Sequence, residues 1–337
     1  MRPILNSKGL PVLLNEREKK ICDINQRAVN ALGYEINVTT LTTIIKKITE
    51  QKFFEIAPAD YIPVRVGEGA WSSNLTTYRS FSLGDDFEKG VINSGANNGR
   101  LSMADAGVDS VNIKVINWAK SIGWSLFDLE QSSKNGNFEL ITVKEHARKK
   151  NWDLGIQKIA FLGSDSDAGV KGLLTLTGST VDTTLIVKPI SAMTPDELKI
   201  FVSNILGRYR ANVARSAWPT HFVIPESDYL GLAGPSSAQF PLKSVLQVLE
   251  ETFQTMCKNK SFKILPLAYG DAAYNAEAKQ IYCLYNANEE SIRMDIPVDY
   301  TNTMANTLDN FTFQNVGYGQ YTGLGNYRPL ELMYFKY

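Results

Sequence analysis

The fold is decided by the stretch Ile156–Leu174, which runs Ile-Gln-Lys-Ile-Ala-Phe-Leu-Gly-Ser-Asp-Ser-Asp-Ala-Gly-Val-Lys-Gly-Leu-Leu. Its first part continues the pattern of a long helix that ends at Phe161-Leu162-Gly163. Its last part, Gly169–Leu174, returns to apolar residues after a short polar loop. The helix is preceded by a long polar segment that cannot pack on the body of its own chain. This order of elements indicates an assembling protein and not one built around a catalytic pocket.

Residues 61–115 are predicted to form an extended, hairpin-like loop. Both of its ends read as strands, because apolar and polar residues alternate in Tyr61–Val66 and in Val111–Asn117. The part between them is rich in glycine and lacks a regular apolar spacing. It cannot bury enough surface to offset roughly 1 to 2 kcal/mol of backbone entropy per ordered residue. We therefore expect residues 67–110 to become ordered only against a neighbouring subunit.

Large aromatic residues in this loop are the candidate intersubunit contacts. The alternative is a flexible surface loop without a partner. Large aromatic side chains in an otherwise disorder-like segment more often anchor a partner than face solvent. The four candidates are Trp71, Tyr78, Phe81 and Phe87.

The composition excludes several classes of protein. A length of 337 residues suits one composite domain or two. The 35 Lys and Arg balance the 35 Asp and Glu, so no overall basic field exists to attract nucleic acid or an anionic membrane. Any contact with nucleic acid must therefore be local and weak. No stretch approaches 18 apolar residues, so no membrane span is expected.

The cysteines and the N-terminus favour a protein that stays in the cytosol. Cys22, Cys257 and Cys283 are odd in number and far apart, so reduced thiols are expected. The first residues have no apolar core of signal-peptide length. We expect a soluble protein that is not exported.

The long helix is predicted over residues 136–161, with two apolar stripes that break off in its middle. Charged residues at this centre, including Arg148, Lys149 and Lys150, predict a helix that is buried at its ends and exposed at its centre. This basic run is either a solvated face or a contact with acidic groups of a neighbouring subunit or with packaged phosphates. Both interpretations stay open at this point.

The remaining elements follow an α+β pattern. Helices are predicted from Thr39, from the capping box Ser125–Asp128 to Gly136, from the capping box Thr194–Glu197, and over Leu242–Met256. Strands are predicted by alternation and by β-branched or aromatic content. They cover residues 221–224, 262–267, 281–285, 292–296, 311–316 and 330–335.

No convincing catalytic or metal-binding set is present. His146 and His221 lack a metal-ligand neighbour at helical spacing and read as surface and strand residues. The segment Asp165–Gly169 only faintly resembles a calcium loop, because no glutamate closes it. Four glycines read as turns in an aromatic β segment: Gly317, Gly319, Gly323 and Gly325. We expect no enzyme activity, no cofactor and no metal.

Taken together, a terminal arm, an extended loop, a short capped helix, a long helix and the passage Ile156–Leu174 resemble a tailed-bacteriophage major capsid protein of the Hong Kong 97 type. The related encapsulin shells share that passage. The resemblance implies an α+β fold whose axial loop, at the axis of each capsomer, carries Tyr269, Asp271 and Tyr274. The implied parts are an N-terminal arm (1–36), a lead-in with one helix (37–60), the extended loop (61–115), a peripheral domain (116–186) with the spine helix 136–161, an axial domain (187–287), and C-terminal strands (288–337) that return to the peripheral domain.

The implied function is structural. Copies of the chain would join as pentamers and hexamers into an icosahedral shell around double-stranded DNA, assembled in the host cytoplasm and carried in the virion. Implied partners are a separate scaffolding protein, a portal, decoration proteins and weakly bound DNA. Lysine-to-asparagine crosslinking is not transferred, because Lys89 is the only lysine between Tyr61 and Ser110. The alternatives are an encapsulin-like compartment around an enzyme cargo and an enzyme with an unrecognised site.

Overall fold

The computed structural model describes residues 52–83, 105–135, 140–235, 243–307, 309 and 311–337. The expected arm 1–36, the helix from Thr39, and Phe87 lie outside these residues. The chain divides into two compact units, Met1–Lys52 with Leu126–Leu140 and Phe53–Ser125 with Ile141–Tyr337. In the first unit the structure describes α2 (Leu126–Asn135), which starts where the capping box predicts. The elements below belong to the second unit, apart from the first residue of α3.

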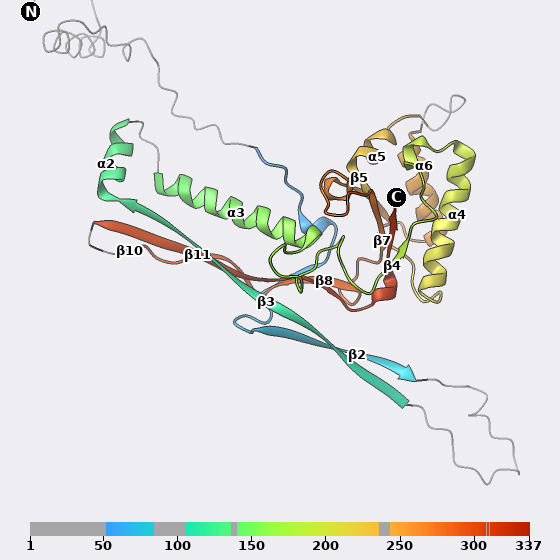
Figure 1. The fold of residues 1–337 in the computed structure, drawn as a ribbon, viewed down its shortest axis with the longest axis horizontal. Coiled ribbons are helices and arrows are strands. Elements are labelled where there is room, and N and C mark those ends of the chain that lie inside the picture. The colour runs from blue at the N-terminus through green and yellow to red at the C-terminus, as the bar shows by residue number, and fades with distance from the viewer. Residues whose placement is uncertain (1–51, 84–104, 136–139, 236–242, 308, 310) are drawn as a thin grey trace, which may run out of the picture. The chain divides into compact units, whose positions relative to one another are not determined.

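The strand β3 (Asp105–Ser125) organises the longest sheet (Figure 1). Its first half pairs antiparallel with β2 (Asn74–Leu83), from Leu83 opposite Asp105 to Asn74 opposite Lys114. Its second half pairs antiparallel with β11 (Thr312–Thr322). Two short strands, β9 (Val298–Asn302) and β10 (Asn306–Thr307), also pair with β11.

The extended loop is therefore more ordered than the sequence predicts. Residues 74–83 and 105–110 form strands that pair within one chain, so the expectation that all of 67–110 needs a neighbour is wrong for these residues. Thr and Tyr have a high strand propensity, so β2 can form although its sequence shows no apolar stripe. Pairing inside the hairpin satisfies their backbone groups. Residues 84–104 lie outside the described part.

The helix α3 (Leu140–Leu162) packs on the sheet through glycines of β11. A Cβ atom at Gly317 would lie 2.6 Å from Nε of Arg148, and one at Gly319 would lie 2.6 Å from the ring of Trp152. Gly317 and Gly319 are thus strand residues that make room for the helix, and the prediction that they form turns is wrong. The predicted spine helix is confirmed from Leu140 onward; residues 136–139 are not described.

A small three-stranded sheet connects distant parts of the chain. β8 (Ile292–Ile296) pairs parallel with β1 (Val64–Val66) and antiparallel with β12 (Leu324–Asn326). Gly325 lies inside β12 and not in a turn. A 3-10 helix at Pro58–Asp60 leads into β1.

The five-stranded sheet has the order β4-β13-β7-β5-β6. Its last strand in the sequence, β13, pairs with β7 and β4. The C-terminal strand therefore joins β4, from the range expected for the peripheral domain, to β7, from the range expected for the axial domain. The strands are β4 (Thr180–Asp182), β5 (His221–Pro225), β6 (Lys263–Leu267), β7 (Ile281–Tyr285) and β13 (Leu332–Lys336).

Two hydrophobic cores share this sheet. Phe222 and Ile224 of β5 point into the core formed with α4 (Pro195–Asn212) and α6 (Val245–Cys257), whereas Val223 points into the core formed with α3. Successive strand residues face opposite sides, so a strand buried on both faces reads as a continuous apolar run. Both helices start at capping boxes, those of Thr194 and Ser244.

Short helices complete the second unit. α5 follows β5, and three 3-10 helices precede α4, follow β6 and precede β13. Their bounds are Glu226–Gly231 for α5 and Ile190–Ala192, Ala268–Gly270 and Pro329–Glu331 for the 3-10 helices.

Candidate assembly surface

The passage after α3 folds back onto the last turn of that helix. The N–H of Leu173 donates to the carbonyl of Ala160 at 2.8 Å, and the N–H of Leu174 donates to the carbonyl of Phe161 at 2.9 Å. Gly163 has φ +83°, and a Cβ at Gly172 would lie 2.5 Å from the backbone of Phe161. Only glycine fits such positions without strain. The two leucines are then buried in the core.

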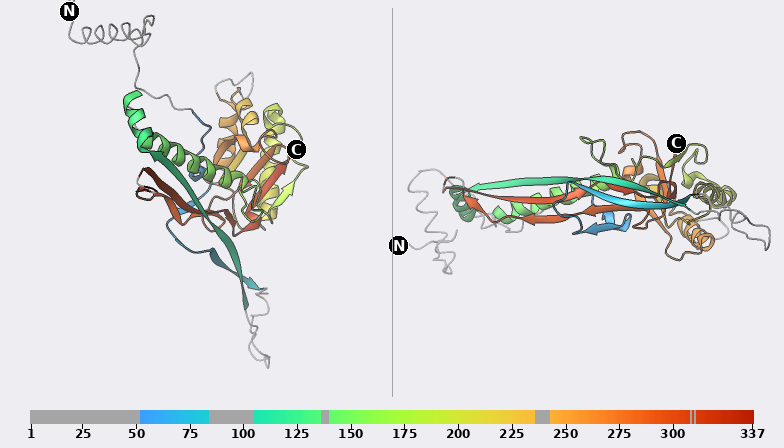
Figure 2. Two further views of the ribbon diagram at one scale, coloured as in Figure 1. Left: turned by 60° about the vertical axis from the view of Figure 1, so that its left-hand side comes forward. Right: turned by 90° about the horizontal axis from the view of Figure 1, so that it is seen from below.

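The β2–β3 hairpin has two unlike faces, because side chains alternate along a strand. One face carries Tyr78, opposite Ser110, and Val108, opposite Ser80. Tyr78 is 74% exposed and Val108 is 68% exposed. Two apolar side chains thus stand free on a ribbon that extends past the end of β11 (Figure 2). A two-stranded ribbon of this kind is only marginally stable alone, and exposed apolar surface on it favours a contact.

The other face of the hairpin is tied to the segment after β12. Arg79 pairs with Asp109 at 2.6 Å across the two strands and also donates to the carbonyl of Tyr327 at 3.3 Å. The side chain of Ile113 lies against Gly325, where no Cβ obstructs it. The pairing with Arg79 holds the pKa of Asp109 below its usual value. The face of the hairpin that carries Arg79 and Ile113, here called its root, is therefore fixed to the rest of the chain. The face that carries Tyr78 and Val108 is exposed.

Trp71 lies in the turn between β1 and β2, and not on the paired part of the hairpin. Its backbone has φ +64°, which is rare for a bulky residue, and its N–H donates to Oε1 of Gln320 at 2.8 Å. The indole lies 6.0 Å from the ring of Tyr318 and is 71% exposed. Phe81 stands opposite Gly107 in the β2–β3 register. Of the predicted aromatic residues, Tyr78 lies on the open face of the hairpin, and the sequence does not reveal Val108 beside it.

Arg148 does not belong to an exposed basic patch. It is 2% exposed, and its Nη1 donates to the carbonyl and to the side-chain oxygen of Asn315 at 3.0 and 2.9 Å. Nη2 donates to Asn302 at 3.0 Å, and Nε donates to the hydroxyl of Tyr300 at 2.8 Å. The fork of the guanidinium satisfies all these acceptors at once, which is why a charge is tolerated there. The prediction of an exposed helix centre is wrong at this residue.

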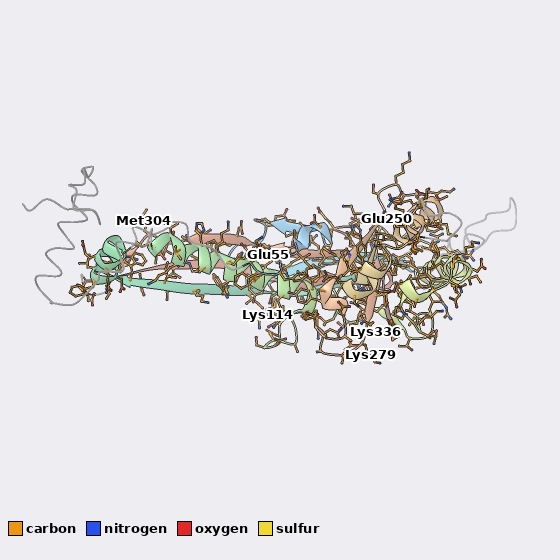
Figure 3. All side chains as sticks on the ribbon, turned by 90° about the horizontal axis from the view of Figure 1, so that it is seen from above. Glu55, Lys114, Glu250, Lys279, Met304 and Lys336 are labelled. Atoms are coloured by element: carbon orange, nitrogen blue, oxygen red, sulfur yellow. The ribbon has the colours of Figure 1, made fainter. Side chains whose placement is uncertain are left out.

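The other two basic residues stay near solvent. Lys149 is exposed, and Lys150 is half-buried and forms an ion pair with Glu55, which is labelled in Figure 3. The segment Asp165–Gly169, which only faintly resembles a calcium loop, is engaged with lysines, since Asp165 pairs with Lys158 at 2.5 Å and Asp167 with Lys114 at 2.6 Å. Of the run Arg148–Lys150, Lys149 and part of Lys150 thus remain accessible to anionic partners.

The three expected axial-loop residues do not form one exposed group. Tyr269 packs against Phe161 of α3 with ring centroids 5.8 Å apart. Asp271 is buried and accepts from the hydroxyl of Ser227 at 2.5 Å. Tyr274 alone of the three is exposed. An aromatic residue and an acid in a polar sequence context do not reveal that neighbouring segments cover them.

The described residues offer few groups for metal binding or for reaction through cysteine. No group of three or more His, Cys, Asp or Glu among them could hold a metal ion. Cys257 and Cys283 are free and buried, and burial raises the pKa of the Cys257 thiol to about 11, so it stays protonated. No helix in the described part is long and apolar enough to span a bilayer.

Comparison with known proteins decides the family. The family model described as the major capsid protein matches residues 91–337. The chain belongs to the major capsid protein family. Its role is therefore structural, as a subunit of a capsid. No curated protein sequence matches the chain.

Solved capsid structures confirm the predicted Hong Kong 97-type fold. The capsid of Myoviridae phage XM1 superposes with a TM-score of 0.73 at 16% identity, covering 90% of this chain and 99% of that chain. The capsid of a native GTA particle gives 0.58 at 13% identity, covering 91% and 98%. A structure from Mycobacterium phage Bobi gives 0.57 at 12% identity, covering 88% and 96%.

Proposed function

We propose that this member of the major capsid protein family forms pentamers and hexamers, which close into an icosahedral shell around double-stranded DNA in a tailed bacteriophage. The observation that carries the proposal is the β2–β3 hairpin. Its root is fixed by Arg79, while Tyr78 and Val108 stand exposed on its open face. A closed shell needs heterologous contacts whose rotation closes, and a ribbon reaching over the next subunit supplies such a contact.

The hairpin can be shortened without disturbing its root. Ser80 and Val108 stand opposite each other, so replacing residues 81–107 by Asn-Gly gives a two-residue turn that suits a hairpin. The pair Arg79–Asp109 is retained. We expect the shortened subunit to keep its denaturation midpoint and to lose closed shells in sedimentation and electron microscopy. Shells as stable as those of the parent would contradict a role in assembly for the part of the hairpin beyond Ser80.

The packaged content distinguishes the two shell functions. The small cationic surface left by Lys149 and Lys150 predicts weak, salt-sensitive DNA contact. A shell that encloses a phage genome predicts that particles purified from infected cells contain nuclease-protected double-stranded DNA. A protein cargo without DNA would favour the encapsulin-like compartment instead. We further propose that assembly takes place in the host cytoplasm with a separate scaffolding protein, a portal and decoration proteins.

The proposal includes no enzyme activity. It is supported by the structural role of the family and by the described cysteines, which are buried. A small fixed oligomer whose melting temperature rises with a metabolite would contradict it.

A further inference from the structure

Gln157 is a buried polar residue on α3 that takes no part in the candidate assembly contacts described above. It is 3% exposed, although the segment it touches, Phe53–Ile56, lies mostly at the surface. A buried carboxamide is retained without cost only where its donors and its acceptor are used. Gln157 uses both, and its partners come from two distant parts of the chain.

The carboxamide binds the segment Phe53–Ile56 as a neighbouring strand would. Oε1 accepts from the N–H of Ile56 at 3.0 Å, and Nε2 donates to the carbonyl of Phe54 at 3.3 Å. These are the backbone groups that a β ladder would engage, yet this segment is not assigned to a strand. One side chain therefore replaces a strand partner.

The same nitrogen reaches the segment that follows β6. Nε2 of Gln157 also donates to the hydroxyl of Tyr269 at 3.1 Å. The ring of Tyr269 lies 6.1 Å from that of Phe54, edge to face. Gln157 thus joins the segment Phe53–Ile56, the helix α3 and the end of the five-stranded sheet at one buried group.

Two other residues on the same face of α3 as Gln157 also contact Phe53–Ile56 or Tyr269. Lys150, two turns before Gln157, pairs with Glu55 and lies 5.9 Å from the ring of Phe53. Phe161, one turn after Gln157, stacks on Tyr269. Residues seven and four positions apart share one face of a helix. The segment Phe53–Ile56 therefore follows a stripe of α3 in which Gln157 supplies the backbone hydrogen bonds.

We propose that Gln157 is a positioning residue that clips Phe53–Ile56 to α3 and to Tyr269, and that this clip fixes the path of Phe53–Ile56 for shell assembly. The assembly part rests on the proposed function. The partner is the chain's own backbone, which the side-chain amide of Gln157 binds through hydrogen bonds to Phe54 and Ile56. Surface ion pairs such as Lys150–Glu55 contribute little by comparison.

The clip is tested first on unassembled subunits. Gln157→Leu removes the acceptor and the donors together, so exchange of the Ile56 amide should quicken by a factor of about 5 to 30. Trypsin should also cut more rapidly after the exposed Lys52. Gln157→Glu keeps an acceptor for Ile56 but not the donors, and should retain much of the protection of that amide. Lys149→Gln, an exposed change on the same helix, is the matched control and should behave as the parent.

Hydrogen exchange of amides in the five-stranded sheet distinguishes the proposed clip from a general contribution of Gln157 to stability. If exchange at Val223 and Cys283 and the denaturation midpoint move together with Ile56, Gln157 only contributes to stability and the proposal is overturned. Unchanged exchange at Ile56 in Gln157→Leu overturns it as well. Faster exchange confined to the segment around Ile56 supports the clip.

Assembly is measured separately. With the clip lost, we expect fewer closed shells and more irregular ones by electron microscopy, at unchanged subunit stability. Normal shells from Gln157→Leu, despite faster exchange at Ile56, would overturn the role in assembly. If the parent itself forms no shells, the proposed function fails, while the exchange experiment still decides on the clip.

Discussion

Arg148 of α3 lies directly over Gly317 of β11, where a Cβ atom would stand 2.6 Å from the guanidinium nitrogen Nε. Two residues further along the strand, Gly319 receives the ring of Trp152, which is four residues after Arg148 on the helix. Strand residues two apart and helix residues four apart each share a face. The two glycines therefore form a bare strip into which one face of the helix fits.

Adding a methyl group to this strip should destabilise the subunit. Gly317→Ala or Gly319→Ala is expected to cost about 1 to 3 kcal/mol of unfolding free energy, because a well-packed contact must shift. Denaturant unfolding measures this loss. Gly155→Ala on α3 is the matched control, since a Cβ there meets no atom within 4 Å. It should be neutral or stabilise the helix by about 0.5 to 1 kcal/mol; equal losses at all three positions would contradict the packing.

Replacing the guanidinium should be costly for a different reason. Arg148→Ala leaves the two buried acceptors of Asn315 without their donor, and is expected to cost about 3 kcal/mol or more. Arg148→Lys keeps the charge but not the fork, so it should restore only part of the loss. Lys149→Ala, next to it and exposed, should stay within about 0.5 kcal/mol of the parent in the same denaturant experiment. Similar losses from Arg148→Ala and Lys149→Ala would restore the idea of an exposed basic patch.

The sequence predicts those parts of the fold that local patterns control. The capping box at Thr194 predicts α4, and the apolar runs around Phe222 and Tyr282 predict β5 and β7. The passage Phe161-Leu162-Gly163 predicts the end of α3, which the structure places at Leu162. These elements depend on residues close together in the chain, so periodicity and turn chemistry suffice.

The errors occur where the partner lies far away in the sequence. Arg148 reads as a surface charge because its acceptors at Asn302 and Asn315 are more than 150 positions away. Gly317 reads as a turn residue because the helix that needs the space is equally distant. The same holds for the assembly surface: Tyr78 is predicted from its type, whereas Val108 becomes visible only through the β2–β3 register. Single-chain patterns carry no information on such pairings.

The core of α4 provides a direct test of the predicted inner face. Leu206 is buried against the five-stranded sheet, so Leu206→Ala should cost about 2 to 5 kcal/mol. Lys199→Ala on the outer face of the same helix should be nearly neutral. Soluble yield and denaturant midpoints measure both. A comparable loss from the two substitutions would mean that the face is wrongly assigned.

His221 should make subunit stability depend on pH. Burial, with a smaller effect of Lys263, lowers the pKa of His221 from its ordinary 6.5 to about 4, so the folded state resists taking up a proton. Above pH 6.5 both states are neutral and nothing is lost. As pH falls from 6.5 towards 4, the unfolded state binds the proton first and stability declines.

The difference between parent and His221→Phe isolates this effect from the carboxylates, which also titrate near pH 4. Phe can keep the stacking on Tyr285, whose ring centroid lies 5.6 Å from the imidazole. The parent should lose stability relative to the variant between pH 6.5 and 4. Parallel curves for the two proteins would show that His221 titrates normally.

The open face of the hairpin should matter for assembly and not for folding. Tyr78 and Val108 are exposed, so the double substitution Tyr78→Thr with Val108→Thr keeps strand propensity and should change subunit stability by no more than about 0.5 kcal/mol. Each copy nevertheless loses apolar contact area. Because every copy in a shell repeats the loss, the yield of closed shells in sedimentation should fall strongly.

Ser80→Thr is the control for this face, since it lies on the same strand and removes no apolar surface. It should assemble as the parent does. If the double variant also builds shells with the yield and heat resistance of the parent, the exposed face of β2–β3 is not an intersubunit contact. The tip beyond Ser80 would then have to supply the contact, which the shortened hairpin tests independently.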